Sequence, residues 1–94
     1  MQFSEFLSLY LTLIETKNID LVRSYTMQLE DHVLKNREFA LAFVEPVNIT
    51  KIQQVLVDKL GISPKSMMLK TRVANPHMRA QMMARAIKTA VERV

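Results

Sequence analysis

Apolar side chains recur at three- and four-residue spacing in four stretches of the chain, which is the period of an amphipathic helix. The first stretch covers residues 3–14, and the second covers residues 18–36. A third covers residues 48–60, and the last begins at residue 75 and runs to the end of the chain. The pattern therefore predicts four helices, each with one apolar face.

Residues that favour helix ends bound these stretches. Asn18 and Asn75 are good N-cap residues, and Pro76 suits the first position of a helix. Asn48 is expected to cap the third helix. Gly61 is expected to end that helix, because glycine takes a positive φ without a steric penalty.

Two shorter segments have the patterns of strands. Residues 39–44 form a continuous apolar run, which is typical of a strand buried on both faces, although a continuation of the second helix is the alternative. Residues 66–73 alternate with a period of two, which also favours a strand. Against this second strand, Ser63 and Pro64 have the form of an N-cap and a first helical residue.

The expected order of elements is therefore helix, helix, strand, helix, strand, helix. This order predicts an α+β fold in which helices cover a small sheet, built as a single domain over residues 1–94. The alternative is an all-α fold that contains a helix-turn-helix.

The sequence gives little support to catalysis. The chain has no cysteine, no glycine-rich loop and two histidines, which do not have the spacing of paired metal ligands. His32 is expected to be a partly buried structural residue. We therefore expect no enzyme activity, no cofactor and no metal site.

The lengths of the apolar runs and the absence of cysteine limit the compartments that we expect for this chain. No apolar run approaches the roughly 20 residues that a membrane-spanning helix needs. The absence of cysteine suits the cytoplasm or another reducing compartment, including a place at the periphery of a membrane complex.

Charge is divided unevenly along the chain, whose formal net charge is +4. Residues 1–47 carry four basic and seven acidic side chains, a net charge of −3. Residues 63–94 carry seven basic side chains and one acidic side chain, a net charge of +6. A basic C-terminal part suggests an acidic partner, such as nucleic acid, anionic lipid or an acidic helix.

Helical wheels show which residues of the second and last helices lie away from the apolar stripe. On the second helix they place four charged residues away from the apolar stripe: Asp20, Arg23, Glu30 and Asp31. On the last helix they place two methionines and two cations on the outside, and these are the predicted contacts with a protein partner or with a second copy of the chain: Met78, Met82, Arg85 and Lys88.

The segment from Asp58 to Met67 is similar to the turn of a helix-turn-helix protein, with Gly61 at the turn. The similarity covers residues 53–72 and implies a recognition helix that opens at Ser63. As the alternative function, a small basic DNA-binding protein, it implies three contacts with nucleic acid: Lys65, Lys70 and Arg72.

A longer stretch resembles the C-terminal part of the ATP synthase delta subunit, the oligomycin-sensitivity-conferring protein. The resemblance covers residues 6–76, and its most recognisable parts are Leu13-Ile14-Glu15, the run at residues 39–44, and Leu69-Lys-Thr-Arg-Val73 followed by Asn75-Pro76. It implies two helices, a strand, a helix and a further strand, in a peripheral-stalk subunit without chemistry of its own. The chain departs from the family after Pro76, where helix replaces a paired-glycine segment. The function that we expect first is a non-catalytic adaptor or stator-like subunit of a larger assembly.

Overall fold

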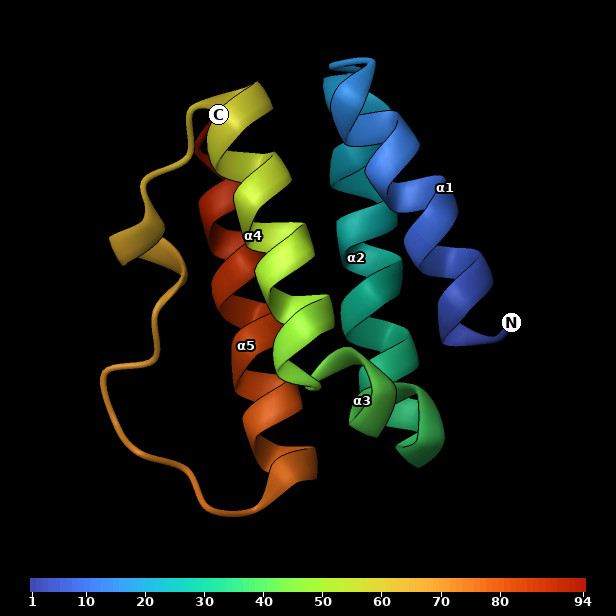
Figure 1. Cartoon of the computed structure of the whole chain (residues 1–94), viewed down its shortest axis with the longest axis vertical. Helices are drawn as coiled ribbons and strands as arrows, with labels where there is room; N and C mark the ends of the chain where they lie inside the picture. Colours follow the sequence, from blue (N-terminus) through green and yellow to red (C-terminus); the bar gives the residue numbers. More distant parts are fainter.

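The computed structural model describes all 94 residues, of which 78% are helical, and it contains no strand. The predicted α+β fold with a small sheet is therefore wrong, and the fold class is all-α. Figure 1 shows four long helices side by side, with a short helix at one end and an irregular segment along the outside. In chain order the elements are α1 (Phe3–Glu15), α2 (Ile19–Lys35), α3 (Arg37–Phe43), α4 (Pro46–Leu60), the 3₁₀ helix η1 (Pro64–Met67) and α5 (Pro76–Glu92).

The first predicted strand, residues 39–44, is the greater part of α3 together with its C-cap residue, Val44. Asn36 ends α2 and at the same time caps α3, because its side chain accepts a hydrogen bond from the Phe39 N–H at 3.1 Å. Phe39, Ala40 and Phe43 are buried on one side of the new helix. A run of only six apolar residues is too short to show the helical period, which is why it had the pattern of a buried strand.

The second predicted strand, residues 66–73, is neither a strand nor a recognition helix. It begins in η1, which ends at Met67, and continues as irregular backbone up to α5. Its alternation arises because Met67 is buried and Leu69 is half-buried, whereas Lys70 and Arg72 are exposed. A surface connection that turns apolar side chains inward imitates the period of a strand, but no second strand pairs with it.

Most of the predicted helix ends are confirmed. The side chains of Asn18 and Asn75 accept hydrogen bonds from the backbone N–H groups three residues later, and Gly61 ends α4 with φ of 66°. The prediction for Asn48 is wrong, because α4 begins earlier, with Pro46 in its first turn. Asn48 instead donates a hydrogen bond to the Ala42 carbonyl at 2.7 Å, which ties α4 to α3.

The direction of the helices determines the connections. In Figure 1, α1, α4 and α5 run the same way, and α2 runs opposite to them. Consecutive antiparallel helices need only short turns, but α4 and α5 are parallel, so the chain must return along the bundle between them. Residues 61–75 make this return, and they are called the crossover here.

The crossover also fills the space between α4 and α5. The backbones of these two helices stay apart, and η1 lies against both of them. Met67 is fully buried there, and the Gln53 amide of α4 donates to the Met67 carbonyl at 3.4 Å. The crossover is therefore fixed to the bundle by a buried side chain.

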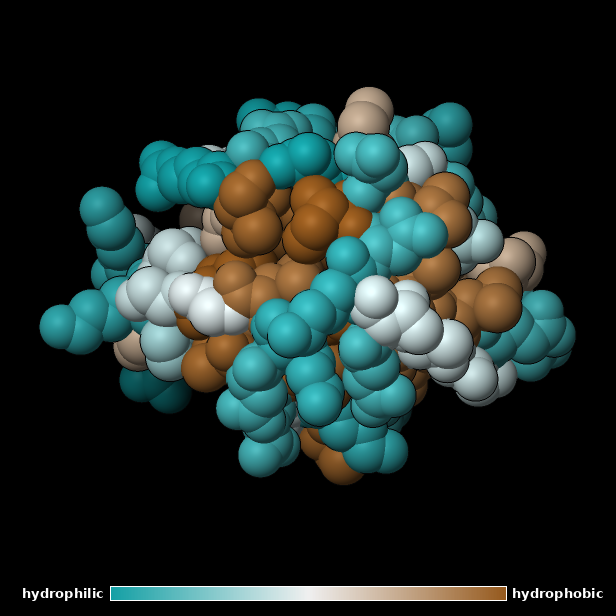
Figure 2. Space-filling view, turned by 90° about the horizontal axis from the view of Figure 1, so that it is seen from above, coloured by the Kyte–Doolittle hydropathy of each residue, from teal (hydrophilic) through white to brown (hydrophobic).

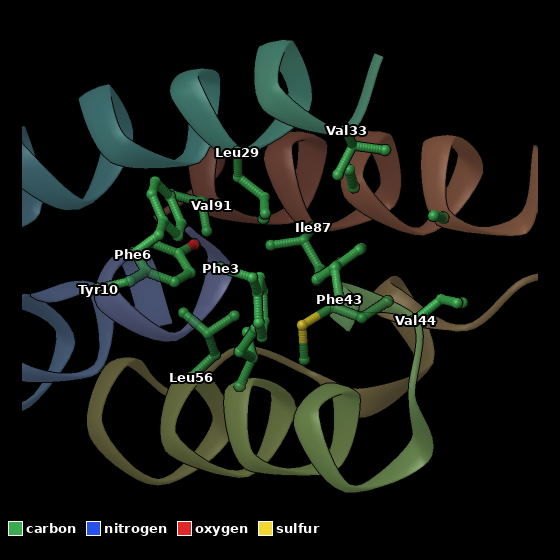
Figure 3. Packing of buried hydrophobic residues seen from close by; sticks show 14 of the residues in the cluster. Phe3, Phe6, Tyr10, Leu29, Val33, Phe43, Val44, Leu56, Ile87 and Val91 are labelled. Atoms are coloured by element: carbon green, nitrogen blue, oxygen red, sulfur yellow. The ribbon is translucent and has the colours of Figure 1, made fainter. Parts of the chain in front are cut away.

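All five α-helices contribute to one apolar core. Figure 3 shows aromatic side chains of α1 and α3 close to aliphatic side chains of α2, α4 and α5. The ring of Phe3 meets the ring of Phe39 edge to face, with centroids 5.2 Å apart, and this arrangement is a favourable one for two aromatic rings. A single core confirms that α3, although only two turns long, is an integral part of the bundle.

One buried polar contact joins α1 to α2. The hydroxyl groups of Tyr10 and Thr26 lie 2.6 Å apart, and the Thr26 hydroxyl donates its hydrogen to the Val22 carbonyl at 2.6 Å. Tyr10 must therefore be the donor to Thr26. Burial raises the pKa of Tyr10 well above its ordinary value, so the phenol stays protonated and keeps this donor role.

With Tyr10 as the donor, Thr26→Val and Tyr10→Phe should lower the free energy of unfolding by different amounts. Thr26→Val leaves the buried Tyr10 hydroxyl without a partner and should lower the free energy of unfolding by about 1 to 3 kcal/mol. Tyr10→Phe removes the donor itself and should cost about 0.5 to 1.5 kcal/mol. Urea unfolding of the two variants measures both values, and a larger loss for Tyr10→Phe would contradict the assignment.

Candidate protein-docking face

The most extensive helix pair of the bundle is α2 with α5, which pack antiparallel. Near one end of the pair, the His77 ring nitrogen Nε2 lies 2.9 Å from the Val33 carbonyl oxygen. Midway along it, Arg85 and Lys88 of α5 meet Glu30 of α2. These contacts fix the register and place Leu34 of α2 at about the level of Met78 and Met82 of α5, from the helical rise.

Glu30 is buried, with 9% of its surface exposed, although the helical wheel places it on the polar side of α2. The wheel assumes that a helix has one apolar face toward one core. Helix α2 packs against both α1 and α5, so its buried arc is wider than its apolar stripe and includes Glu30. The acidic side chain is tolerated there because two cations of α5 contact it.

The ion pairs of Glu30 have good geometry. Arg85 Nε donates to Glu30 Oε2 at 3.0 Å, and Lys88 Nζ donates to Oε1 at 3.4 Å. Burial raises the pKa of Glu30, but the hydrogen bonds and charges of Arg85 and Lys88 outweigh burial, so that its pKa lies below the ordinary value. The carboxylate therefore stays ionised at neutral pH and holds α2 against α5.

The structure separates the four predicted contact residues into two kinds. Met78 and Met82 are 54% and 39% exposed, on the outside of α5. Lys88 is mostly covered and is occupied by Glu30, so its role is chiefly internal. The Arg85 side chain is 73% exposed and uses only its Nε for Glu30, which leaves both terminal nitrogens of the guanidinium free toward solvent.

Helix α2 adds two residues that the sequence analysis missed. Met27 and Leu34 are 56% and 49% exposed, and they lie on the side of α2 that borders α5, on the same arc as Glu30. The signal was available in the sequence, because both are large apolar residues off the main stripe of their helix. Together with the outer residues of α5, they are called the α2/α5 face here: Met27, Leu34, Met78, Met82 and Arg85.

The residues of the alternative prediction lie elsewhere. Lys65 is in η1, and Lys70 and Arg72 are in the irregular part of the crossover. All three are exposed, and none of them forms an ion pair. The crossover packs on the side of α5 that carries Met83, whose sulfur lies 3.6 Å from the Gln53 amide nitrogen, and not on the side that borders α2.

A second apolar area lies at the end of the bundle where α1, α4 and α5 finish. Figure 2 looks onto this end and shows apolar side chains between polar ones. Leu60, in the last turn of α4, is half-buried, and Val94 is 43% exposed. Arg23 donates a hydrogen bond to the Val94 carbonyl, which ties this end of the chain to α2. Because this internal contact already occupies part of the area, we take the α2/α5 face as the stronger candidate.

His32 and one open groove lie outside the α2/α5 face. The His32 ring is partly buried and stacks on Phe39, with centroids 4.9 Å apart, as expected for a structural histidine. An open groove of about 530 Å³ lies beside the start of α1, with Phe3 and Phe39 in its wall and Glu38 as its one acidic group.

No three histidine or carboxylate side chains come together as metal ligands. None of the helices is both long enough and apolar enough to cross a membrane.

The ion pairs of Glu30 predict how stability depends on pH. A lowered pKa in the folded state means that the contribution is present above the unfolded-state value and is lost as the pH falls through the folded value. Between about pH 5 and pH 3, the free energy of unfolding should therefore fall more steeply for the wild type than for Glu30→Gln. At neutral pH, Glu30→Gln should cost about 1 to 2 kcal/mol.

Asp31→Asn is the matched control, because Asp31 is exposed and forms no ion pair. It should change stability by less than about 0.5 kcal/mol and keep the steepness of the wild type. Chemical unfolding at a series of pH values gives both quantities. Parallel curves for the wild type and Glu30→Gln would show that Glu30 does not carry the coupling.

Comparison with protein-family models, with curated proteins and with solved structures finds no match to this chain.

Proposed function

We propose that this chain is a non-catalytic adaptor subunit that binds a helix of a protein partner on its α2/α5 face. The observation that carries the proposal is the set of large apolar side chains left in solvent along one helix pair. Met27, Leu34, Met78 and Met82 are each between 39% and 56% exposed. Exposed apolar residues gathered on one side of a small domain are typical of an interaction surface.

The side chains on this face suit a helical partner. Three of the four apolar residues are methionines, whose flexible thioethers adapt to the shape of a partner surface. An amphipathic helix docks on an apolar surface of this kind with apolar residues at three- and four-residue spacing. The docking requires no rearrangement of the bundle, because these side chains already point outward.

Arg85 supplies a polar contact beside the apolar ones. Its Nε is held by Glu30 at 3.0 Å, so the side chain is already oriented, and its terminal nitrogens remain free to bind a carboxylate of the partner in a bidentate manner. Arginine is also enriched among the residues that contribute most to binding at interfaces. We therefore expect a partner helix with an acidic residue beside its apolar stripe.

The proposal rests on this face and not on the resemblance to the delta subunit. The two strands that the resemblance implies are α3 and the irregular crossover in this structure. Membership of a larger assembly remains part of the proposal, because a domain of this size has a small core and gains stability from a docked neighbour.

Site-directed photo-crosslinking tests the proposal. With a benzophenone amino acid at position 82, the chain should crosslink to one protein in the cells that express it, whereas the same group at the exposed position 68 of the crossover should not. With that protein purified, Met78→Glu combined with Met82→Glu should weaken binding by at least about tenfold in calorimetry, because two buried contacts become charged.

A double variant at other exposed apolar positions, Val47→Glu with Met68→Glu, serves as the control and should bind as the wild type does. Equal losses for the two double variants would mean that added negative charge, and not the α2/α5 face, weakens binding. Crosslinks that join only two copies of this chain would make the face a homo-oligomer interface and overturn the adaptor role.

A further inference from the structure

A long part of the chain has no acidic residue. No aspartate or glutamate lies between Asp58 and Glu92, while seven lysines and arginines fall in this interval. Two of the seven, Arg85 and Lys88, are neutralised in part by Glu30 of α2. The other five, which include all three cations of the crossover, have no ion-pair partner.

The crossover sorts its side chains by polarity. Ile62 and Met67 are 6% and 0% exposed and fix the segment against the bundle. Lys65, Lys70 and Arg72 are exposed along its outer side. The three cations therefore lie on one connecting segment, called the strip here, which runs along the outside of α4 and α5 in Figure 1.

The exposed side chains of this strip are mostly charged or polar. Of its large apolar residues only Met68 projects well into solvent, at 63% exposed, and no aromatic residue is present in residues 61–75. Protein interfaces have an apolar centre, and a segment that inserts in a membrane has an apolar face, so the strip suits a partner bound by charge better than either of these. The segment has no aromatic platform for stacked bases and no recognition helix for the major groove, which leaves the phosphates as the groups that its cations can bind.

We infer that the crossover binds the phosphate backbone of nucleic acid through Lys65, Lys70 and Arg72, without preference for base sequence. Three cations that replace condensed counterions give binding that is electrostatic and strongly dependent on salt. This site lies on the side of α5 that carries Met83, away from α2, and the inference does not depend on the proposed docking of a protein on the α2/α5 face.

Salt titration of binding tests the inference. Fluorescence anisotropy with two 20-base-pair DNA duplexes of unrelated sequence should give equal affinities, and the logarithm of the association constant should fall with the logarithm of salt concentration with a slope of about −2.7, since each phosphate contact contributes about −0.9. Between 50 and 200 mM salt, this slope corresponds to a loss of affinity of roughly 40-fold. In the variant Lys65→Gln, Lys70→Gln, Arg72→Gln, the slope should approach zero.

A charge-matched variant separates the strip from net charge. Lys35→Gln, Arg37→Gln, Lys51→Gln removes three exposed, unpaired cations from other elements, so that both triple variants have a net charge of +1, which is three less than the +4 of the wild type. This control should keep a slope close to that of the wild type. Circular dichroism confirms that both variants fold.

Three outcomes would overturn the inference: a slope near zero in the wild type, equal losses in the two triple variants, or binding to vesicles that contain phosphatidylserine in the absence of binding to either duplex. The third outcome would assign the strip to an anionic membrane.

Discussion

The parallel arrangement of α4 and α5 is the constraint on which much of this structure depends. Two consecutive helices that run the same way require a return segment, and here that segment also separates the two helices and fills the space between them with Met67. A shorter connection would force α5 to run the other way, which would take Arg85 and Lys88 away from Glu30. The crossover is thus a structural element as well as a surface.

The two proposed surfaces follow from the position of α5. One edge of α5 packs on α2, and there the bundle buries Glu30 and leaves methionines and one guanidinium outside. The other edge receives η1, and there Met67 turns inward while the cations of the crossover turn outward. A single helix therefore separates the two proposed surfaces, one mainly apolar and one mainly basic, and the two suit different classes of partner.

The sequence predicted the four long helices and most of their ends, because helical period and capping residues act locally. Asn18, Asn75 and Gly61 have the roles that their chemistry implies. Both predicted strands were wrong for the same reason. Over six to eight residues, a short buried helix or a connection that packs on the surface can show the same apolar pattern as a strand. Glu30 could not be placed from the wheel, since its burial depends on a helix more than fifty residues away in the chain.

The arrangement of α4, crossover and α5 is tested most directly by nuclear Overhauser effects from the methyl group of Met67. The structure predicts contacts from this methyl group to side chains of both α4 and α5, together with helical backbone shifts for α3 and irregular shifts for residues 68–75. Cross-strand contacts between residues 39–44 and residues 66–73, with strand shifts in both, would contradict the helical bundle and remove the basis of both proposed surfaces.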